Sequence, residues 1–326
     1  MDVPVADLPA WFIGLAAFVF GAAWGSFFNV CIYRWPRGMS VVSPPSHCTH
    51  CETPVRFRDN LPILGWLLLR GKTSCCGEPL SPRYAVVELL TALLALALAQ
   101  RFAMHAPPGT TVLMATLVTG SYFVFVGGLI IATFVDLEFM EIPDEVSLPG
   151  AALGLATVAL RDPDGIGDAA LGAGGGFLVV QLVFVWSYEH LTGRRGMGEG
   201  DSKLLMMIGA FTGWQGAVFA VVAGSAQGLL LALFALVTGR DLGPDLSNDP
   251  RDEEEAERRD EDNDDDEDDD DPAAGDARHG DGEPEPAYVG HLKMPFGPML
   301  ALGALEYLFF GDRVITWWFD LMISAS

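Results

Sequence analysis

Long apolar runs separated by short polar segments make up most of this sequence of 326 residues. Most runs hold close to the ~20 residues with which an α-helix crosses the hydrocarbon core of a bilayer. The pattern predicts an all-α polytopic membrane protein with about eight transmembrane helices. These helices are expected near residues 11–33, 84–101, 112–135, 146–160, 168–190, 202–214, 216–239 and 295–311.

Two of the apolar segments allow a second interpretation. The helix expected at 202–214 is shorter than a comfortable span and could be re-entrant. That arrangement would invert everything after it and remove Trp214, Trp317 and Trp318 from a shared aromatic belt at the outer interface. The glycine-rich run Leu171–Phe177 superficially suggests a phosphate loop. It lies inside an apolar run and follows no strand, so close helix packing is the preferred interpretation.

The lysine and arginine residues indicate the orientation of the helices, because these residues are retained on the cytoplasmic side. With the N-terminus outside, 16 of the 19 basic residues fall in the cytoplasmic loops or directly beside them. This orientation places Asp136, after the third helix, and Asp201, before the sixth, at one depth. The cytoplasmic loops are then 34–83, 136–145, 191–201 and 240–294.

The net charge of −24 is concentrated in one polar segment. Residues 241–290 account for −19 of it, with 23 acidic residues and four arginines. Such a segment cannot bury enough surface to offset its chain entropy, so it is predicted to be disordered, with an acidic docking tail as the alternative. The chain therefore divides into a first transmembrane helix (1–33), a cytoplasmic Cys-rich insert (34–83), a transmembrane core with both aspartates (84–240), an acidic disordered loop (241–293), and a last transmembrane helix with the C-terminus (294–326).

Four of the five cysteines lie in the insert, as the pairs Cys48, Cys51 and Cys75, Cys76. So few cysteines in so large a chain do not indicate a secreted disulfide scaffold. A C-x2-C pair followed by a second pair can present four thiolates to tetrahedral zinc, and the metal would supply folding energy that a small insert lacks. Adjacent cysteines point apart, so His47 or His50 in place of Cys75 stays open as the fourth ligand, as do four reduced cysteines without a metal. Cys31 is expected to serve in packing.

Asp136 and Asp201 are ionisable residues at the ends of apolar runs, where such residues mark functional sites in membrane proteins. If the fold brings them together, two carboxylates at close range share one proton. The ionised carboxylate can then take a proton from water while the protonated one polarises a peptide carbonyl. The sequence therefore predicts aspartic-protease chemistry.

Each polar residue around the pair also has a purely structural interpretation. Asp201 could act only as an N-cap, but a plain cap does not need the three glycines before it, which free the backbone and allow a substrate strand to approach. Asp144, after Pro143, is expected to be a turn or cap residue. Lys203 either pairs with a carboxylate or extends to the interface.

Several short motifs together resemble one known family. They are residues 25–34 (GSFFNVCIYR), the cysteine insert, Asp136 with 142–144 (IPD), residues 198–201 (GEGD) with Lys203, and residues 295–298 (PFGP). On these motifs the chain resembles the type IV prepilin peptidases, membrane aspartic proteases of the GxGD kind, over nearly its whole length except 241–290.

The resemblance implies an enzyme of the bacterial inner membrane, with its active site facing the cytoplasm. It implies cleavage of prepilins and type II secretion pseudopilins before their hydrophobic helix, and methylation of the new N-terminal amine by S-adenosylmethionine. The implied partners are these precursors and the lipid bilayer, with no nucleic acid. The implied site residues are catalytic Asp136 and Asp201, an active-site loop with Gly198, Gly200, Lys203, Pro143 and Asp144, and zinc ligands Cys48, Cys51, Cys75 and Cys76.

One position of the second cysteine pair departs from the family pattern. The family's second cysteine pair is usually C-x-x-C-Gly, which would place a cysteine at position 73, where this chain has Thr73.

Two other functions compete with this interpretation. A peptidase without methyltransferase activity is the first alternative function. An ion-coupled transporter is the second, and it would carry its aspartates at mid-depth on broken helices.

Overall fold

The computed structural model describes residues 3–48, 50–187, 190, 198–238 and 295–324. All regular elements in these ranges are helical, and only isolated β-bridges occur besides them. The acidic segment 241–290 lies outside the described residues. The elements are η1 (Val5–Asp7), α1 (Ala10–Arg34), η2 (Trp35–Arg37), α2 (Leu64–Leu68), α3 (Arg83–Ala99), η3 (Gln100–Met104), α4 (Val112–Phe139), α5 (Asp144–Ala156), α6 (Val158–Arg161), α7 (Ile166–Val179), η4 (Val180–Ser187), α9 (Glu199–Thr238) and α11 (Gly297–Ser324).

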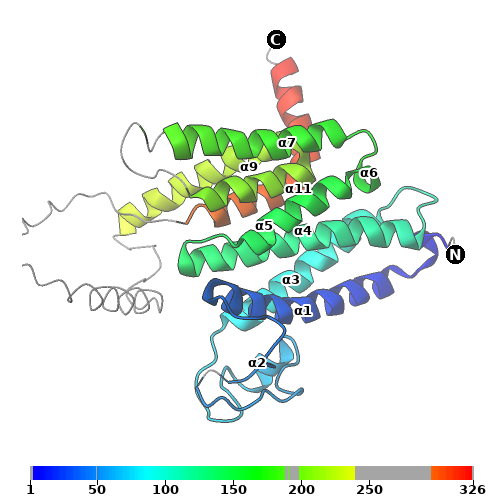
Figure 1. The fold of residues 1–326 in the computed structure, drawn as a ribbon. Helices are drawn as coiled ribbons and strands as arrows, with labels where there is room; N and C mark the ends of the chain where they lie inside the picture. The colour runs from blue at the N-terminus through cyan, green and yellow to red at the C-terminus, as the bar shows by residue number, and fades with distance from the viewer. Residues whose placement is uncertain (1–2, 49, 188–189, 191–197, 239–294, 325–326) are drawn as a thin grey trace, which may run out of the picture.

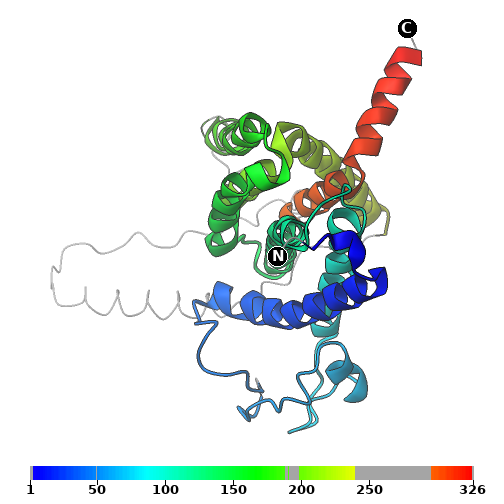
Figure 2. The ribbon, with the colours of Figure 1, turned by 90° about the vertical axis from the view of Figure 1, so that its right-hand side faces the viewer.

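The long helices pack side by side in one bundle, and the Cys-rich insert lies below it in Figure 1, beside α1 and α3 (Figures 1 and 2). Small residues allow α1 and α3 to approach closely. A β-carbon on Gly21 would lie 2.6 Å from Ala95 Cβ, and one on Gly25 would lie 2.7 Å from Glu88 Cα. The insert is therefore held against a tightly packed helix pair.

The glycine-rich run predicted to serve helix packing does so. A β-carbon on Gly172 in α7 would lie 2.5 Å from the backbone of Gly213 and 2.7 Å from the Trp214 nitrogen in α9. Gly209 packs backbone to backbone against Gly172. These contacts confirm that the run provides small residues for a helix crossing and is not a phosphate loop.

The helix α9 turns back on itself at Gly213, whose φ of 72° and ψ of −178° are not helical. After this residue the chain runs antiparallel to α11, because Ala220 contacts Gly303 and Gly224 contacts Met299. Positive φ favours glycine here, since it has no β-carbon to clash. The two helices expected at 202–214 and 216–239 are thus both present, joined by a single glycine.

A half-buried arginine caps the first half of this hairpin. The break at Gly213 interrupts the helical hydrogen bonds of the preceding turn, and Arg161 at the end of α6 donates to the Phe211 carbonyl at 2.7 Å and to the Ala210 carbonyl at 3.2 Å. A cation at a helix C-terminus also compensates the helix dipole. Because the two carbonyls lie about 50 positions further along the chain, no local sequence pattern indicates this contact.

Five of the described helices are long and apolar enough to cross a membrane. One of the five is the 40-residue helix α9 with its break, and the first fifteen residues of α11 form a shorter apolar helix. The expected count of eight crossings stays a prediction. Three boundaries differ from expectation: the helix near 146–160 is divided at Thr157, the helix near 168–190 changes to π winding at Val180, and the last helix extends to Ser324 instead of ending near 311.

Candidate active site and cysteine cluster

Asp136 lies in the last turn of α4 and is 5% exposed. Its Oδ2 accepts a hydrogen bond of 2.9 Å from the backbone N–H of Gly297, the first residue of α11. The N-terminus of a helix carries partial positive charge and unpaired N–H groups, so it stabilises a carboxylate. A segment 161 positions away along the chain therefore fixes the orientation of Asp136.

Asp201 lies in the first turn of α9 and is 8% exposed. Its Oδ2 accepts a hydrogen bond of 3.3 Å from the backbone N–H of Gly198, which precedes the helix. This back-bond is one half of a capping box, in which the third helical residue satisfies the N–H of the cap. Asp201 is thus inside the helix and is not its N-cap residue, although it does help to close the first turn.

The fold brings the two aspartates together at one end of the bundle. The Asp136 carboxyl bonds to Gly297 at the start of α11, and the Asp201 carboxyl bonds to Gly198 at the start of α9. Ile142, between α4 and α5, packs against both neighbouring backbones: a β-carbon on Gly200 would lie 2.9 Å from Ile142 Cβ, and one on Gly297 would lie 3.0 Å from Ile142 Cδ1. Three chain segments therefore meet around the carboxyl pair.

This packing gives a different reason for Gly200 than the sequence suggested. Neither Gly198 nor Gly200 has positive φ, and Gly200 is helical. Gly200 is required because Ile142 occupies the space of its β-carbon. The third glycine of the motif, Gly196, lies outside the described residues.

Two ion pairs at this end of the bundle connect the elements that carry the aspartates. Lys203 Nζ lies 2.7 Å from both carboxylate oxygens of Asp144, so it pairs α9 with the first turn of α5, where Pro143 precedes the helix. Glu138, in α4, pairs with Arg83 at the start of α3. Such partly exposed pairs contribute about 0–1 kcal/mol each, so they position the elements more than they stabilise the fold.

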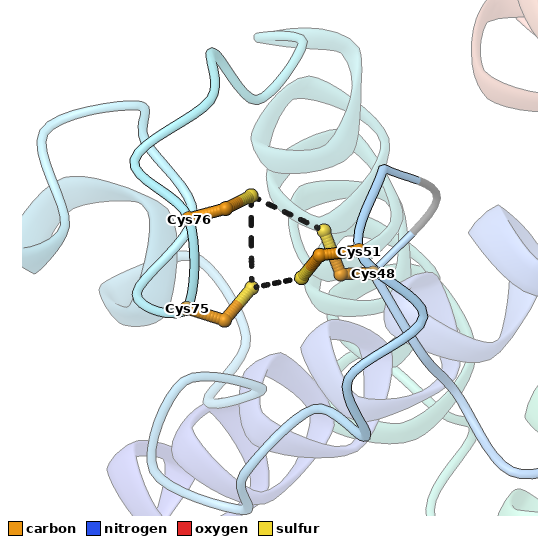
Figure 3. A group of neighbouring side chains, drawn as sticks. All are labelled: Cys48, Cys51, Cys75 and Cys76. Carbon is orange, nitrogen blue, oxygen red and sulfur yellow. Dashed lines mark hydrogen bonds between the residues drawn. The ribbon is translucent and has the colours of Figure 1, made fainter.

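The four insert cysteines converge on one point, and Figure 3 shows their side chains directed toward one another. All four sulfur atoms lie within 4.8 Å of one another. The Cys48–Cys76 separation is 3.8 Å and the Cys75–Cys76 separation is 3.9 Å. Zinc–sulfur bonds of about 2.3 Å place the sulfurs of a tetrahedral site about 3.8 Å apart. The adjacent pair thus fits a common tetrahedral site.

Two similar turns of the insert present these cysteines, and they explain the missing cysteine at position 73. In the first turn the Cys48 N–H donates to Thr53 O and the Glu52 N–H donates to Cys48 O. In the second turn the Thr73 N–H donates to Glu78 O and the Gly77 N–H donates to Thr73 O. Thr73 therefore occupies the position in the second turn that Cys48 occupies in the first turn. Cys75, two residues later, supplies the fourth sulfur in its place, and the Thr73 hydroxyl lies 3.2 Å from Cys76 Sγ.

The ionisation of this cluster favours a bound cation. Hydrogen bonding with Thr53 lowers the pKa of the Cys51 thiol to about 6. The adjacent Cys51 sulfur raises the pKa of Cys75 to about 12. Without a metal, one ionised sulfur therefore keeps its neighbour protonated, whereas zinc binding requires deprotonated thiols and supplies the compensating charge. The remaining cysteine, Cys31, is fully buried in α1, as expected for a packing residue.

The helical bundle and the buried carboxyl pair at its end define a multi-pass membrane protein with a two-aspartate site. Residues 19–102 match the Bacterial Peptidase A24 N-terminal domain, and residues 123–233 match the Type IV leader peptidase family. The chain belongs to the type IV leader peptidase family. This membership and the five apolar helices support a multi-pass protein of the bacterial inner membrane.

Several relatives carry the name prepilin leader peptidase/N-methyltransferase. The protein from Aeromonas hydrophila is 36% identical over 247 residues, covering 68% of this chain and 81% of its own length. The protein from Myxococcus xanthus is 31% identical over 340 residues, covering 98% of this chain and 96% of its own length. The protein from Klebsiella pneumoniae is 35% identical over 208 residues, covering 62% and 86%. No solved structure matches the chain.

Proposed function

We propose that this protein cleaves the leader peptides of prepilins and type II secretion pseudopilins and N-methylates the new N-terminal residue. The buried pair Asp136 and Asp201, at one end of an apolar bundle in a chain of the type IV leader peptidase family, is the observation that carries this proposal. Relatives named for both activities and matched over most of their length support its two parts.

The proposed peptidase mechanism divides the work between the two carboxyl groups. One carboxylate takes a proton from water, and the protonated partner donates a hydrogen bond to the scissile carbonyl as the oxygen gains charge. The N–H groups of Gly297 and Gly198 hold one oxygen of each side chain, so the carboxyl groups need little reorganisation when the substrate binds. The titration belongs to the pair and not to either residue alone.

The site suits a substrate with a polar leader and an apolar helix. The scissile bond of such a substrate lies at the membrane surface, where a pair at the end of the bundle reaches it without extracting the helix. We propose that this end faces the cytoplasm, since the basic residues concentrate in its loops. Acidic residues near the pair would attract a basic leader, but Glu138 already pairs with Arg83, which weakens its contribution to that attraction.

The same geometry weighs against an ion-coupled transporter. A transporter of that kind would carry its aspartates at mid-depth on interrupted helices. Asp136 lies in the last turn of α4 and Asp201 in the first turn of α9, and the described break at Gly213 lies at the other end of its helix from Asp201.

We further propose that Cys48, Cys51, Cys75 and Cys76 hold one zinc ion. The converging sulfurs and the deprotonation that the Thr53 contacts favour at Cys51 support this ligand set. When bound, zinc supplies a cross-link between the two turns of the insert, whose described residues form only the two short helices η2 and α2. For the active-site loop beside the two aspartates, we propose the residues that the sequence predicted, which are Gly198, Gly200, Lys203, Pro143 and Asp144.

The bifunctional proposal predicts methyl incorporation that depends on cleavage. Purified protein in lipid is incubated with a prepilin and S-adenosylmethionine carrying a labelled methyl group. We expect the label on the mature pilin and not on the uncut precursor, because only cleavage exposes the acceptor amine. Full cleavage without label would leave a peptidase alone, and label without cleavage would contradict the proposed order.

A further inference from the structure

A cavity of about 240 Å³ lies between the insert and the helices α1 and α3. Its walls come from the end of α1, the start of α3 and both turns of the insert, and the cysteine cluster contributes Cys48 and Cys75 to its rim. The proposed peptidase mechanism uses none of these residues. The cavity nevertheless contains two of the few deeply buried polar side chains of the protein, Asn29 and Glu88.

Asn29 presents an unpaired hydrogen-bond acceptor in this cavity. The side chain is 3% exposed, and its Nδ2 donates to the Gly25 carbonyl at 3.3 Å and to the Tyr84 carbonyl at 3.0 Å. These two bonds fix the amide so that its Oδ1 is the free atom. Oδ1 is buried and has no hydrogen-bond partner among the described residues. A buried acceptor without a donor is costly, so a ligand that donates a hydrogen bond would be favoured here.

Glu88 adds a buried carboxyl group to the same cavity. The residue is 8% exposed, and its Oε2 accepts a hydrogen bond of 2.6 Å from the Ile63 N–H of the insert. Within the described ranges, no lysine or arginine forms an ion pair with it. A buried carboxylate that no cation compensates favours a cationic ligand or one with several hydroxyl donors.

Aromatic side chains complete the walls of the cavity. Tyr33 from α1, Trp66 from the insert and Tyr84 from α3 all line it. The Trp66 indole is held in place because its Nε1 donates to the Leu80 carbonyl at 3.0 Å. Flat aromatic faces stack on planar heterocycles and attract cations. The volume suits a group of nucleoside size.

We infer that this cavity binds S-adenosylmethionine, with the adenosyl part near Asn29 and Glu88, an inference that rests on the proposed methyltransferase function. The ligand offers an exocyclic amine and a ribose diol as donors, a planar adenine and a sulfonium cation. These features complement a free acceptor, an uncompensated carboxylate and aromatic walls.

The location is consistent with methylation of a freshly cleaved substrate. Arg83, at the start of α3, pairs with Glu138, two residues after Asp136, and Arg37 stacks on Phe139 at the end of α4. The cavity and the aspartate pair therefore share one end of the bundle. The neutral amine of the mature pilin attacks the methyl carbon, the carbon–sulfur electron pair remains on sulfur, and the amine loses a proton to water.

The test is equilibrium binding of labelled S-adenosylmethionine to the purified full-length protein, without any prepilin. Glu88→Gln keeps a carbonyl oxygen for the Ile63 N–H but removes the charge, and we expect at least about 10-fold weaker binding. Glu145→Gln is the matched control, because Glu145 is an exposed acid in the first turn of α5. It should leave the affinity unchanged. Zinc content of each variant shows whether the insert remains folded.

The outcomes separate this inference from the proposed function. Wild-type affinity in a zinc-loaded Glu88→Gln variant would overturn the assigned cavity and leave the methyltransferase proposal standing. No binding by the wild-type protein would overturn both. If Glu88→Gln loses zinc, labelling of the wild type with 8-azido-S-adenosylmethionine decides instead: label on residues 29–34 or 84–88 supports the cavity, and label confined to other peptides overturns it. If Glu88→Gln binds a lysine-containing leader peptide more weakly than the wild type does, but binds S-adenosylmethionine equally well, the cavity binds the leader peptide and the inference is overturned.

Discussion

Asp136→Asn and Asp201→Asn are each expected to reduce prepilin cleavage by about 10³-fold or more, while the protein still inserts into the membrane. Each change removes the ability to hold or release the shared proton, and general acid–base catalysis contributes about 10²–10⁴-fold in rate. Asparagine can still accept the hydrogen bonds from Gly297 and Gly198, so the local packing should survive. The measurement is the initial rate of leader removal by equal amounts of purified protein.

Asp164→Asn is the control for these two variants. Asp164 is an exposed aspartate in the turn between α6 and α7, whose residues Asp162 and Gly165 lie near the break of α9 at Gly213, and its variant should cleave at the wild-type rate. Substantial residual processing by either Asp136→Asn or Asp201→Asn would remove the pair from the mechanism.

Cys75→Ser is expected to lose most of the bound zinc, with at least about 100-fold weaker metal affinity. Replacing the sulfur leaves three thiolates around the ion and no fourth ligand at position 73. The double variant Thr73→Cys with Cys75→Ser should recover the metal, because it restores the C-x-x-C spacing that the first turn of the insert uses. Elemental analysis of the purified variants measures zinc per chain.

Cys31→Ala serves as the matched cysteine control and should retain its zinc, since Cys31 is buried in α1 away from the cluster. A wild-type protein that purifies without metal would contradict the zinc site. Full zinc content in Cys75→Ser would show instead that a histidine is the fourth ligand, which was the alternative that the sequence left open.

The apolar pattern predicted most helices because their burial in lipid depends on local composition. The run before Asp136 was expected to end at 135, and α4 continues to Phe139, where Met140 adopts positive φ and ends the helix. The change to π winding at Gln100 and at Val180 leaves no mark in hydrophobicity. The reversal at Gly213 depends on one backbone angle, so the sequence indicated two helices but not how closely they connect.

The candidate site was predictable in its residue types but not in its contacts. Position at the ends of apolar runs identified Asp136 and Asp201, and spacing identified the cysteines. The hydrogen bond from the Gly297 N–H to Asp136 and the packing of Ile142 against Gly200 and Gly297 join segments that are distant in sequence, so no local pattern predicts them. Residues 295–298 belonged to the recognised motifs, but they did not indicate the hydrogen bond from Gly297 to Asp136. Asn29 belonged to a recognised motif, but its free acceptor is apparent only once α3 lies against α1.

The proximity of positions 136 and 201 is the central claim, and cysteine cross-linking measures it most directly. Asp136→Cys with Asp201→Cys is treated in membranes with a short bifunctional thiol reagent, and joined peptides are identified by mass spectrometry. The control pair is Asp136→Cys with Thr212→Cys, which lies eleven residues further along the same helix segment, about 16 Å away. We predict a link between 136 and 201 and none in the control pair; unlinked cysteines at 136 and 201, under conditions that join the cysteines of the insert, would contradict the account.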